Sequence, residues 1–294
     1  MSMGERLLGS AEFELVRQFE LQVHRRANGL ASGEQRSPAL GGGIEFADYR
    51  EYRDGDDVRQ VDWTVFLRLR KLLVKLSAEE KDLTLMVILD NSRSMNFGTP
   101  DKFRLARQIA AILAGIALKT GNAAGILCWG KDLQELVRPL RGQRNLEWIS
   151  QSLQSLSMVQ NVDTVRCMRQ FAARYGRRCM TVLISDLLYE EWSETLSTLG
   201  ASECDCHVIQ VLAPEERDPG QQGEVTFVDM EDDTELPLHL DSPTLEAYRG
   251  ELTEFLAEVT GQCRRTGIRH SLVSSDKALG RVFHEDLSRG GLVC

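Results

Sequence analysis

The strongest pattern in this chain is a set of short apolar runs separated by longer amphipathic segments. Residues 84–89 read Thr-Leu-Met-Val-Ile-Leu, and so short and uniformly apolar a run is typical of a strand buried on both faces. Runs of this kind occupy residues 83–89, 123–129, 180–184, 206–212 and 270–274. Between them, amphipathic patterns predict helices over residues 102–119, 146–156, 165–175, 190–199 and 242–265. This alternation predicts an α/β fold with a doubly wound, mostly parallel sheet.

Before this alternation, three segments carry their own patterns. Apolar residues spaced among charged ones between residues 10 and 30 predict an amphipathic N-terminal helix. The apolar run at 72–76 is separated from the strand at 83–89 by a short polar stretch, so we expect the two strands to pair as a hairpin. Between the helix and these strands lies an extension rich in arginine, aspartate and aromatic residues, from 44 to 63.

A further hairpin interrupts the second half of the alternation. Two β-type runs between residues 224 and 240 flank a turn signal, which predicts a β-hairpin insertion near 223–241. Ser242 and Pro243 then mark the start of the next helix, with Ser242 as its cap. We therefore divide the chain into residues 1–82, with the helix, loop and extension, and an α/β domain of residues 83–294 that carries the hairpin.

Composition narrows the possible function classes. The 294 residues carry a formal net charge of −9, which disfavours nonspecific binding to nucleic acid or to an anionic membrane surface. No apolar run approaches the roughly 20 residues of a membrane span, and the N-terminus has no apolar signal region. Seven scattered cysteines indicate reduced thiols. We therefore expect a cytoplasmic protein that binds no nucleic acid and is not an integral membrane protein.

Polar side chains directly follow two of the predicted strands: Asp90, Ser92 and Ser94 after the strand at 83–89, and Ser185 and Asp186 after the strand at 180–184. The carboxyl ends of parallel strands meet at one edge of a sheet, where open α/β folds bind ligands. Carboxylate and hydroxyl oxygens suit a hard cation, so the pattern predicts a site for Mg²⁺, or for Mn²⁺ or Ca²⁺. The alternative is that the two aspartates only cap the helices that follow them.

The extension at 44–63 mixes charges of both signs with aromatic residues. Its arginines alternate with aspartates and glutamates, which favours ion pairs within the protein over contacts with nucleic acid. We expect these pairs to surround buried aromatic side chains, Trp63 among them.

The first strand end resembles a known kind of site. Asp90, Ser92 and Ser94 match the motif Asp-x-Ser-x-Ser of the metal-ion-dependent adhesion site of von Willebrand factor A domains. In that family a threonine from a second loop and an aspartate from a third complete the site. The second loop of this chain reads Asn-Val-Asp-Thr at 161–164 in place of the usual Gly-Thr, so Thr164, or Asp163 in its stead, would contribute. The implied metal ligands are Asp90, Ser92, Ser94, Thr164 and Asp186.

The extension resembles the signature of a second family. Residues 50–63 follow the pattern Arg-x-Tyr-x-x-Gly-Asp-Asp-x-Arg-x-x-Asp-Trp, which is similar to the motif that precedes an A domain in the domain-of-unknown-function 58 family. The segment 223–236 is similar to an insertion of that family, and the resemblance covers about residues 25 to 293. It implies an adaptor or chaperone-like partner of MoxR-type AAA ATPases, beside which members are often encoded.

Two functions follow from the predicted site. In the first, the cation takes an acidic side chain of a partner protein as its last ligand, and the chain is a non-enzymatic, metal-dependent binding module. In the second, the chain is a metal-dependent phosphoryl-transfer enzyme with Asp90 as nucleophile. Such an enzyme needs a second carboxylate two residues on, where Ser92 stands, and no phosphate-binding glycine loop is present. We therefore favour the non-enzymatic module.

Overall fold

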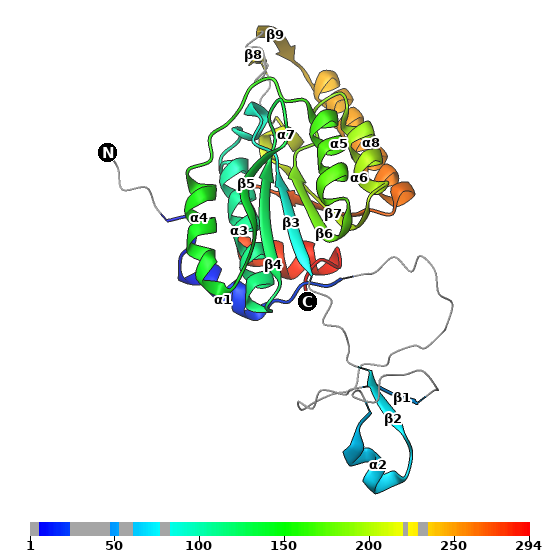
Figure 1. Ribbon diagram of the computed structural model, residues 1–294. Helices are drawn as coiled ribbons and strands as arrows, with labels where there is room; N and C mark the ends of the chain where they lie inside the picture. Colours follow the sequence, from blue (N-terminus) through cyan, green and yellow to red (C-terminus); the bar gives the residue numbers. More distant parts are fainter. Residues whose placement is uncertain (1–5, 24–47, 53–60, 77–82, 220–222, 229–234) are drawn as a thin grey trace. The chain divides into compact units, whose positions relative to one another are not determined.

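The computed structural model describes residues 6–23, 48–52, 61–76, 83–219, 223–228 and 235–294 (Figure 1). The chain forms two compact units, one of residues 1–26 with 83–294 and one of residues 27–82. The candidate site lies in the larger unit.

A six-stranded sheet forms the centre of the larger unit. Its strands, in spatial order, are β10 (Arg269–Ser274), β7 (Glu203–Leu212), β6 (Arg177–Ser185), β3 (Thr84–Leu89), β4 (Ala123–Cys128) and β5 (Gln134–Arg141). All neighbours pair in parallel except β5, which runs antiparallel to β4 at the edge. The prediction of an α/β fold with a doubly wound, mostly parallel sheet is confirmed.

The edge strand β5 is the one strand of this sheet that the sequence pattern does not predict. Val137 is its only buried residue, and its other positions are exposed or half-buried. An edge strand pairs on one side only and tolerates charged side chains. The apolar signature that marks the inner strands is therefore missing from β5.

Helices cover both faces of the sheet (Figure 1). One face carries α1 (Ser10–Gln18), α3 (Lys102–Lys119), α4 (Leu146–Gln154) and the C-terminal π-helical turn η4 (Val282–Leu287), and the other carries α5 (Thr164–Tyr175), α6 (Trp192–Gly200) and α8 (Ser242–Thr266). Strand β3 serves both layers, because Leu85 and Val87 join the first core while Met86 and Ile88 join the second. This two-sided burial explains the uninterrupted apolar run.

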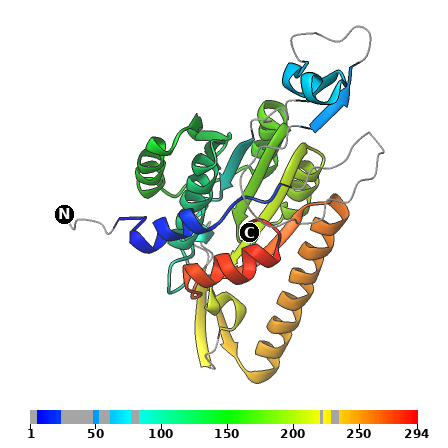
Figure 2. The ribbon, with the colours of Figure 1, turned by 90° about the horizontal axis from the view of Figure 1, so that it is seen from below.

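The N-terminal helix is shorter than predicted and belongs to the larger unit. It ends at Gln18, because the next residues extend along the C-terminus: the amide of Glu20 donates to the carbonyl of Cys294 at 3.0 Å. Figure 2 shows α1 and the C-terminal residues side by side. Lys119 of α3 donates to the carbonyl of Phe19 at 2.8 Å. The structure thus groups α1 with residues 83–294, whereas the sequence-based division placed it with residues 1–82.

The smaller unit differs from the prediction in two ways. Strand β2 (Leu73–Leu76) pairs antiparallel with β1 (Asp48–Glu51). The predicted hairpin between 72–76 and 83–89 is wrong, because both edges of β3 are taken by β4 and β6. Trp63, which begins helix α2 (Trp63–Leu69), is 55% exposed, so the prediction that it is buried is also wrong. The charged residues 53–60 lie outside the described part of the chain.

The predicted hairpin insertion is confirmed. Strands β8 (Gly223–Val228) and β9 (Glu235–Leu240) pair antiparallel, and a short helix that the sequence pattern does not predict, α7 (Pro214–Arg217), precedes them. The cap of α8 is Asp241, not Ser242, because the Asp241 carboxylate accepts the amide of Thr244 at 2.9 Å. Within the described residues, no helix is both long and apolar enough to cross a membrane.

A buried histidine in the sheet gives the larger unit a pH-dependent stability. Burial lowers the pKa of His207 to about 3, and its Nε2 bonds with Ser271 Oγ at 2.9 Å. Between about pH 3 and the ordinary value of about 6.5 the unfolded chain therefore binds more protons than the folded one. The stability from this residue is complete above about pH 6.5 and is lost as the pH falls toward 3.

We expect His207→Gln to weaken the dependence of stability on pH, because glutamine keeps a polar group near Ser271 but does not titrate. Urea unfolding at pH 7 and pH 5 measures the effect. The loss of unfolding free energy between the two pH values should be smaller by about 2 kcal/mol in the variant. Equal losses in both proteins would show that His207 does not titrate as its burial requires.

Candidate functional site

The candidate site lies where the order of the strands reverses. Counted from β3 along the chain, the sheet has the order 3-2-1-4-5-6 of doubly wound folds, and its topological switch point lies between β3 and β6. Ligands of open α/β sheets bind outside the carboxyl ends of the strands at such a point. Asp90 follows β3 and Asp186 follows β6. The amide of Asp90 donates to the carbonyl of Ile184 at 2.9 Å, which joins the two strand ends.

The loop after β3 gathers three of the predicted ligands. Asp90 is fully buried, and its Oδ1 accepts the amide of Ser92 at 2.9 Å and the Ser92 hydroxyl at 2.6 Å. The hydroxyls of Ser92 and Ser94 lie 3.0 Å apart, and Asp90 Oδ2 accepts the hydroxyl of Ser185 at 2.6 Å. These partners of Asp90 are neutral. Burial, followed by the charge of Asp186, raises the pKa of Asp90 to about 7.

A residue inside the motif holds this loop against its neighbours. Asn91 is fully buried. Its side-chain oxygen accepts the amide of Trp129 at 3.0 Å, and its side-chain nitrogen donates to the carbonyl of Ser157 at 3.0 Å. The Asn91 carbonyl also accepts the amide of Val159 at 2.9 Å. Asn91 therefore fixes the loop after β3 to the loop after β4 and to the loop before α5.

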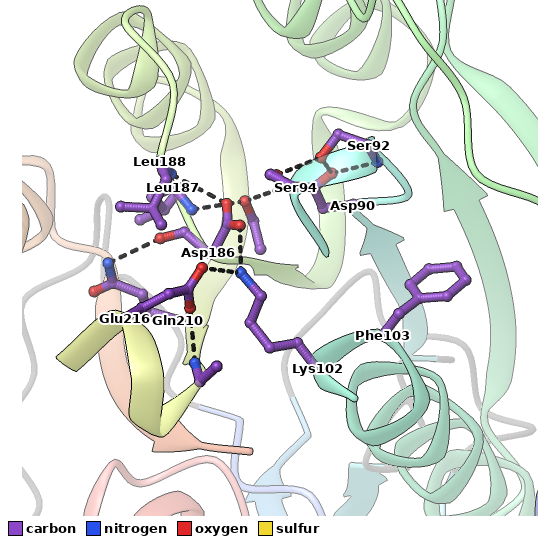
Figure 3. Close-up of polar contacts among 12 residues, drawn as sticks. Asp90, Ser92, Ser94, Lys102, Phe103, Asp186, Leu187, Leu188, Gln210 and Glu216 are labelled. Carbon is purple, nitrogen blue, oxygen red and sulfur yellow. Dashed lines mark hydrogen bonds and ion pairs between the residues drawn. The ribbon is translucent and has the colours of Figure 1, made fainter. Parts of the chain in front are cut away.

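Asp186 is held in place by a second set of contacts (Figure 3). Its Oδ1 accepts the amide of Leu188 at 3.1 Å, and its carbonyl accepts the side-chain amide of Gln210 at 3.0 Å. Its Oδ2 lies 2.9 Å from Nζ of Lys102, in an ion pair whose two side chains are fully buried. The same Nζ lies 2.5 Å from Oε1 of Glu216 on α7.

These two carboxylates determine the protonation state of Lys102. Burial lowers the pKa of Lys102, but the charges and hydrogen bonds of Asp186 and Glu216 outweigh burial and raise it above the ordinary value. Lys102 is therefore charged. With all four groups ionised, the three carboxylates of Asp90, Asp186 and Glu216 and the one ammonium leave two negative charges at the switch point.

Thr164 is placed differently from the other predicted ligands. It is the first residue of α5, it is buried, and its Oγ1 lies 3.3 Å from that of Thr195 on α6. No hydrogen bond among the described residues joins it to the aspartates or serines of the site. Asp163, the alternative ligand, is exposed and caps α5 by accepting the amide of Arg166 at 2.9 Å. The structure thus gives Asp163 a capping role.

The structure therefore brings together four of the five predicted ligands. Asp90, Ser92 and Ser94 are in contact, and Asp186 joins them through its neighbour Ser185. The capping alternative is wrong for Asp186, because α6 begins after Glu191 and no side chain caps it.

Sequence reasoning missed Lys102, Glu216 and Asn91. One signal for Lys102 was present in the sequence. Lys102 lies four residues before Ala106 and seven before Ile109, on the buried stripe of α3. A lysine in such a stripe requires a buried carboxylate partner. The pattern does not say which carboxylate that is.

The donor set fits a hard divalent cation. No group of three or more His, Cys, Asp or Glu side chains able to hold a metal occurs in the described ranges, so a metal here relies on hydroxyl oxygens. Asp90 is a buried carboxylate whose described partners carry no positive charge, and two serine hydroxyls lie beside it. Such oxygens suit Mg²⁺, Mn²⁺ or Ca²⁺.

Comparison with known proteins identifies the family of this chain. The family model described as "Protein of unknown function DUF58" matches residues 48–255, which include most of the extension, the site and the hairpin insertion. The chain belongs to the DUF58 family. A relative of this DUF58 protein is the uncharacterized protein Rv1480 of Mycobacterium tuberculosis, 25% identical over 258 residues, which span 86% of this chain and 81% of Rv1480. The uncharacterized protein Mb1516 of Mycobacterium bovis matches to the same extent.

Solved structures similar to this DUF58 protein share little sequence with it. The conserved hypothetical protein BatB from Bacteroides thetaiotaomicron is 13% identical, with a TM-score of 0.44 over 71% of this chain and 98% of BatB. An aerotolerance-related membrane protein from Bacteroides fragilis is 14% identical, with a TM-score of 0.41 over 69% of this chain and 98% of that protein. Similarities of this size assign no function to this chain.

Proposed function

We propose that this DUF58 protein is a non-enzymatic, metal-dependent protein-binding module. Asp90, Ser92 and Ser94 would hold a divalent cation, Mg²⁺ or else Mn²⁺ or Ca²⁺, and Asp186 and Thr164 are the further ligands that the resemblance implies. The bound cation supplies an open coordination position for a carboxylate oxygen of a partner protein. The observation that carries the proposal is the buried Asp90 carboxylate, whose hydrogen-bond partners among the described residues are all neutral and which lies against two serine hydroxyls at the switch point.

The charges around the site support docking of an acidic partner. Lys102 already neutralises one charge of the pair Asp186 and Glu216, and the serine hydroxyls are neutral. A divalent cation held by Asp90 would therefore balance the two negative charges that remain at the switch point when all four groups are ionised. Because the chain as a whole carries −9, a site whose negative charge the cation balances would repel a partner carboxylate less than the rest of the surface does.

The family resemblance supports a MoxR-type AAA ATPase, or a client of that ATPase, as the partner. The chain would then be a cytoplasmic adaptor or chaperone-like factor. Direct binding of the purified native protein to the MoxR-type ATPase of the same organism, measured by interferometry in Mg²⁺ and in EDTA, tests this. We expect binding in Mg²⁺ and at least about tenfold weaker binding in EDTA, which corresponds to about 1.4 kcal/mol. Equal binding in both buffers would contradict metal-dependent docking.

The alternative is a metal-dependent phosphoryl-transfer enzyme with Asp90 as nucleophile. Two residues after Asp90 stands Ser92, whose hydroxyl donates to Asp90, and Asp186 is paired with Lys102. Neither residue offers a free carboxylate as general acid or base. We expect no Mg²⁺-dependent hydrolysis of p-nitrophenyl phosphate above the blank. Turnover that Asp90→Asn abolishes would favour the enzyme.

A further inference from the structure

Lys102 is a permanent positive charge inside the candidate site. It is fully buried, and its ammonium lies between Asp186 Oδ2 at 2.9 Å and Glu216 Oε1 at 2.5 Å. Desolvating an ammonium is costly unless carboxylates compensate it. The two carboxylates reach Lys102 from separate segments, Asp186 from the loop after β6 and Glu216 from the short helix α7 that follows β7 (Figure 3). The ion pairs of Lys102 therefore belong to the packed structure of this sheet edge. They lie beside the cluster of Asp90, Ser92 and Ser94.

The fixed position of Asp186 leaves one of its oxygens for a cation. Its Oδ1 accepts the amide of Leu188 and its carbonyl accepts the side chain of Gln210. The remaining oxygen, Oδ2, is the one that Lys102 contacts. An ammonium and a divalent cation that share this buried oxygen repel each other strongly, because the surroundings screen charge poorly.

Glu216 offers Lys102 a second acceptor. It lies on α7, and its other oxygen, Oε2, accepts the amide of Ala213 at 2.7 Å, which holds the carboxylate toward Lys102. Lys102 can thus keep one charged partner if it gives up Asp186. The Lys102 ammonium therefore has two acceptors at the site, and it can stay paired with Glu216 when a metal ion binds Asp186.

We propose that Lys102 competes with a divalent cation for Oδ2 of Asp186, and that this competition sets the metal affinity of the site. The inference rests on the proposed metal-dependent function. Lys102 is then an affinity-determining residue that acts through Asp186. In its absence, Asp186 is free to contribute its charge to the metal, and the affinity of the site rises.

Calorimetric titration of the full chain with Mn²⁺ alone tests the competition. We expect Lys102→Met, which keeps the length of the side chain, to bind Mn²⁺ about tenfold or more tightly than the native protein, within the range of coupling between residues in contact. Mn²⁺ should also raise the melting temperature of this variant by more than it raises that of the native protein. Unchanged affinity would overturn the proposal.

A double-mutant cycle separates competition for Asp186 from a general effect of charge. In an Asp186→Asn background, Lys102→Met should produce no further gain in affinity. The same gain in both backgrounds would overturn the specific role of Asp186. Lys277→Met is a matched control, because Lys277 also bridges two carboxylates, Glu285 at 2.9 Å and Asp286 at 2.7 Å, and its loss should leave Mn²⁺ affinity unchanged.

A further variant keeps the proposal testable if Lys102→Met does not fold. Glu216→Gln removes the second negative charge that Lys102 contacts, so Lys102 should remain on Asp186 and Mn²⁺ should bind more weakly. Equal or tighter binding by Glu216→Gln would overturn the proposal. If Lys102→Met binds Mn²⁺ and the native protein does not, the competition stands and the proposed metal-dependent docking fails. Absence of binding in every variant would overturn both.

Discussion

The Asp90→Ala variant should lose divalent-cation binding altogether while its fold stays intact. Asp90 is the carboxylate of the site whose described partners are all neutral, so it is the group on which a cation depends most. Native protein should gain about 2.7 kcal/mol of stability when Mg²⁺ is present at 100 times its dissociation constant, and the variant should gain none. Urea unfolding with Mg²⁺ and with EDTA measures both gains.

The fold should survive because the Asp90 charge does not stabilise the metal-free protein. Burial and the charge of Asp186 raise the pKa of Asp90 to about 7, so its ionised form is disfavoured in the folded state. Asp132→Ala is the control, since Asp132 is an exposed carboxylate in the loop after β4 that pairs with Arg166 at 2.7 Å. This control should keep the full stabilisation by Mg²⁺. An Asp90→Ala protein that is still stabilised by Mg²⁺ would remove Asp90 from the site.

Trp129→Ala should destabilise the larger unit by about 3–5 kcal/mol, as expected for a core aromatic residue. Trp129 is fully buried, and its ring meets that of Tyr189 edge-on with centroids 5.6 Å apart. Its indole nitrogen has no hydrogen-bond partner among the described residues. The expected loss of stability therefore comes from lost packing contacts. Circular dichroism during urea unfolding measures it.

Trp63→Ala is the matched control for this substitution. Trp63 is 55% exposed, and its ring contacts Phe66 with centroids 6.1 Å apart. Its removal should cost about 1 kcal/mol or less, the range of exposed positions and single aromatic pairs. A loss for Trp63 as large as that for Trp129 would mean that a further surface covers Trp63 in solution.

Much of the fold is readable from the sequence because hydrophobic periodicity is a local property. The run 84–89 predicts a strand buried on both sides, and the structure divides its side chains between two cores. Helix α3 spans the predicted residues 102–119. The strand-end position of Asp90 and Asp186 also follows from the pattern, since parallel strands carry their following loops to one edge.

Elements at the sheet edge and in the smaller unit were harder to predict from the sequence. Strand β5 has one paired side, so it lacks an apolar signature. Strand β2 is as apolar as a hairpin partner of β3 should be, yet it pairs with β1. Which strands pair depends on the edges left free by the rest of the sheet, and a local pattern does not record those edges.

The sequence by itself determined the α/β class, the inner strands and the motif of Asp90, Ser92 and Ser94. The tertiary structure decided what surrounds that motif. Lys102 meets Glu216 across 114 positions of sequence, and Asp186 meets Lys102 across 84. Such pairs arise from the order of the strands, because β3, β6 and β7 are neighbours whose following loops converge. The pattern near each residue predicts its burial, and the strand order alone sets its charged partner.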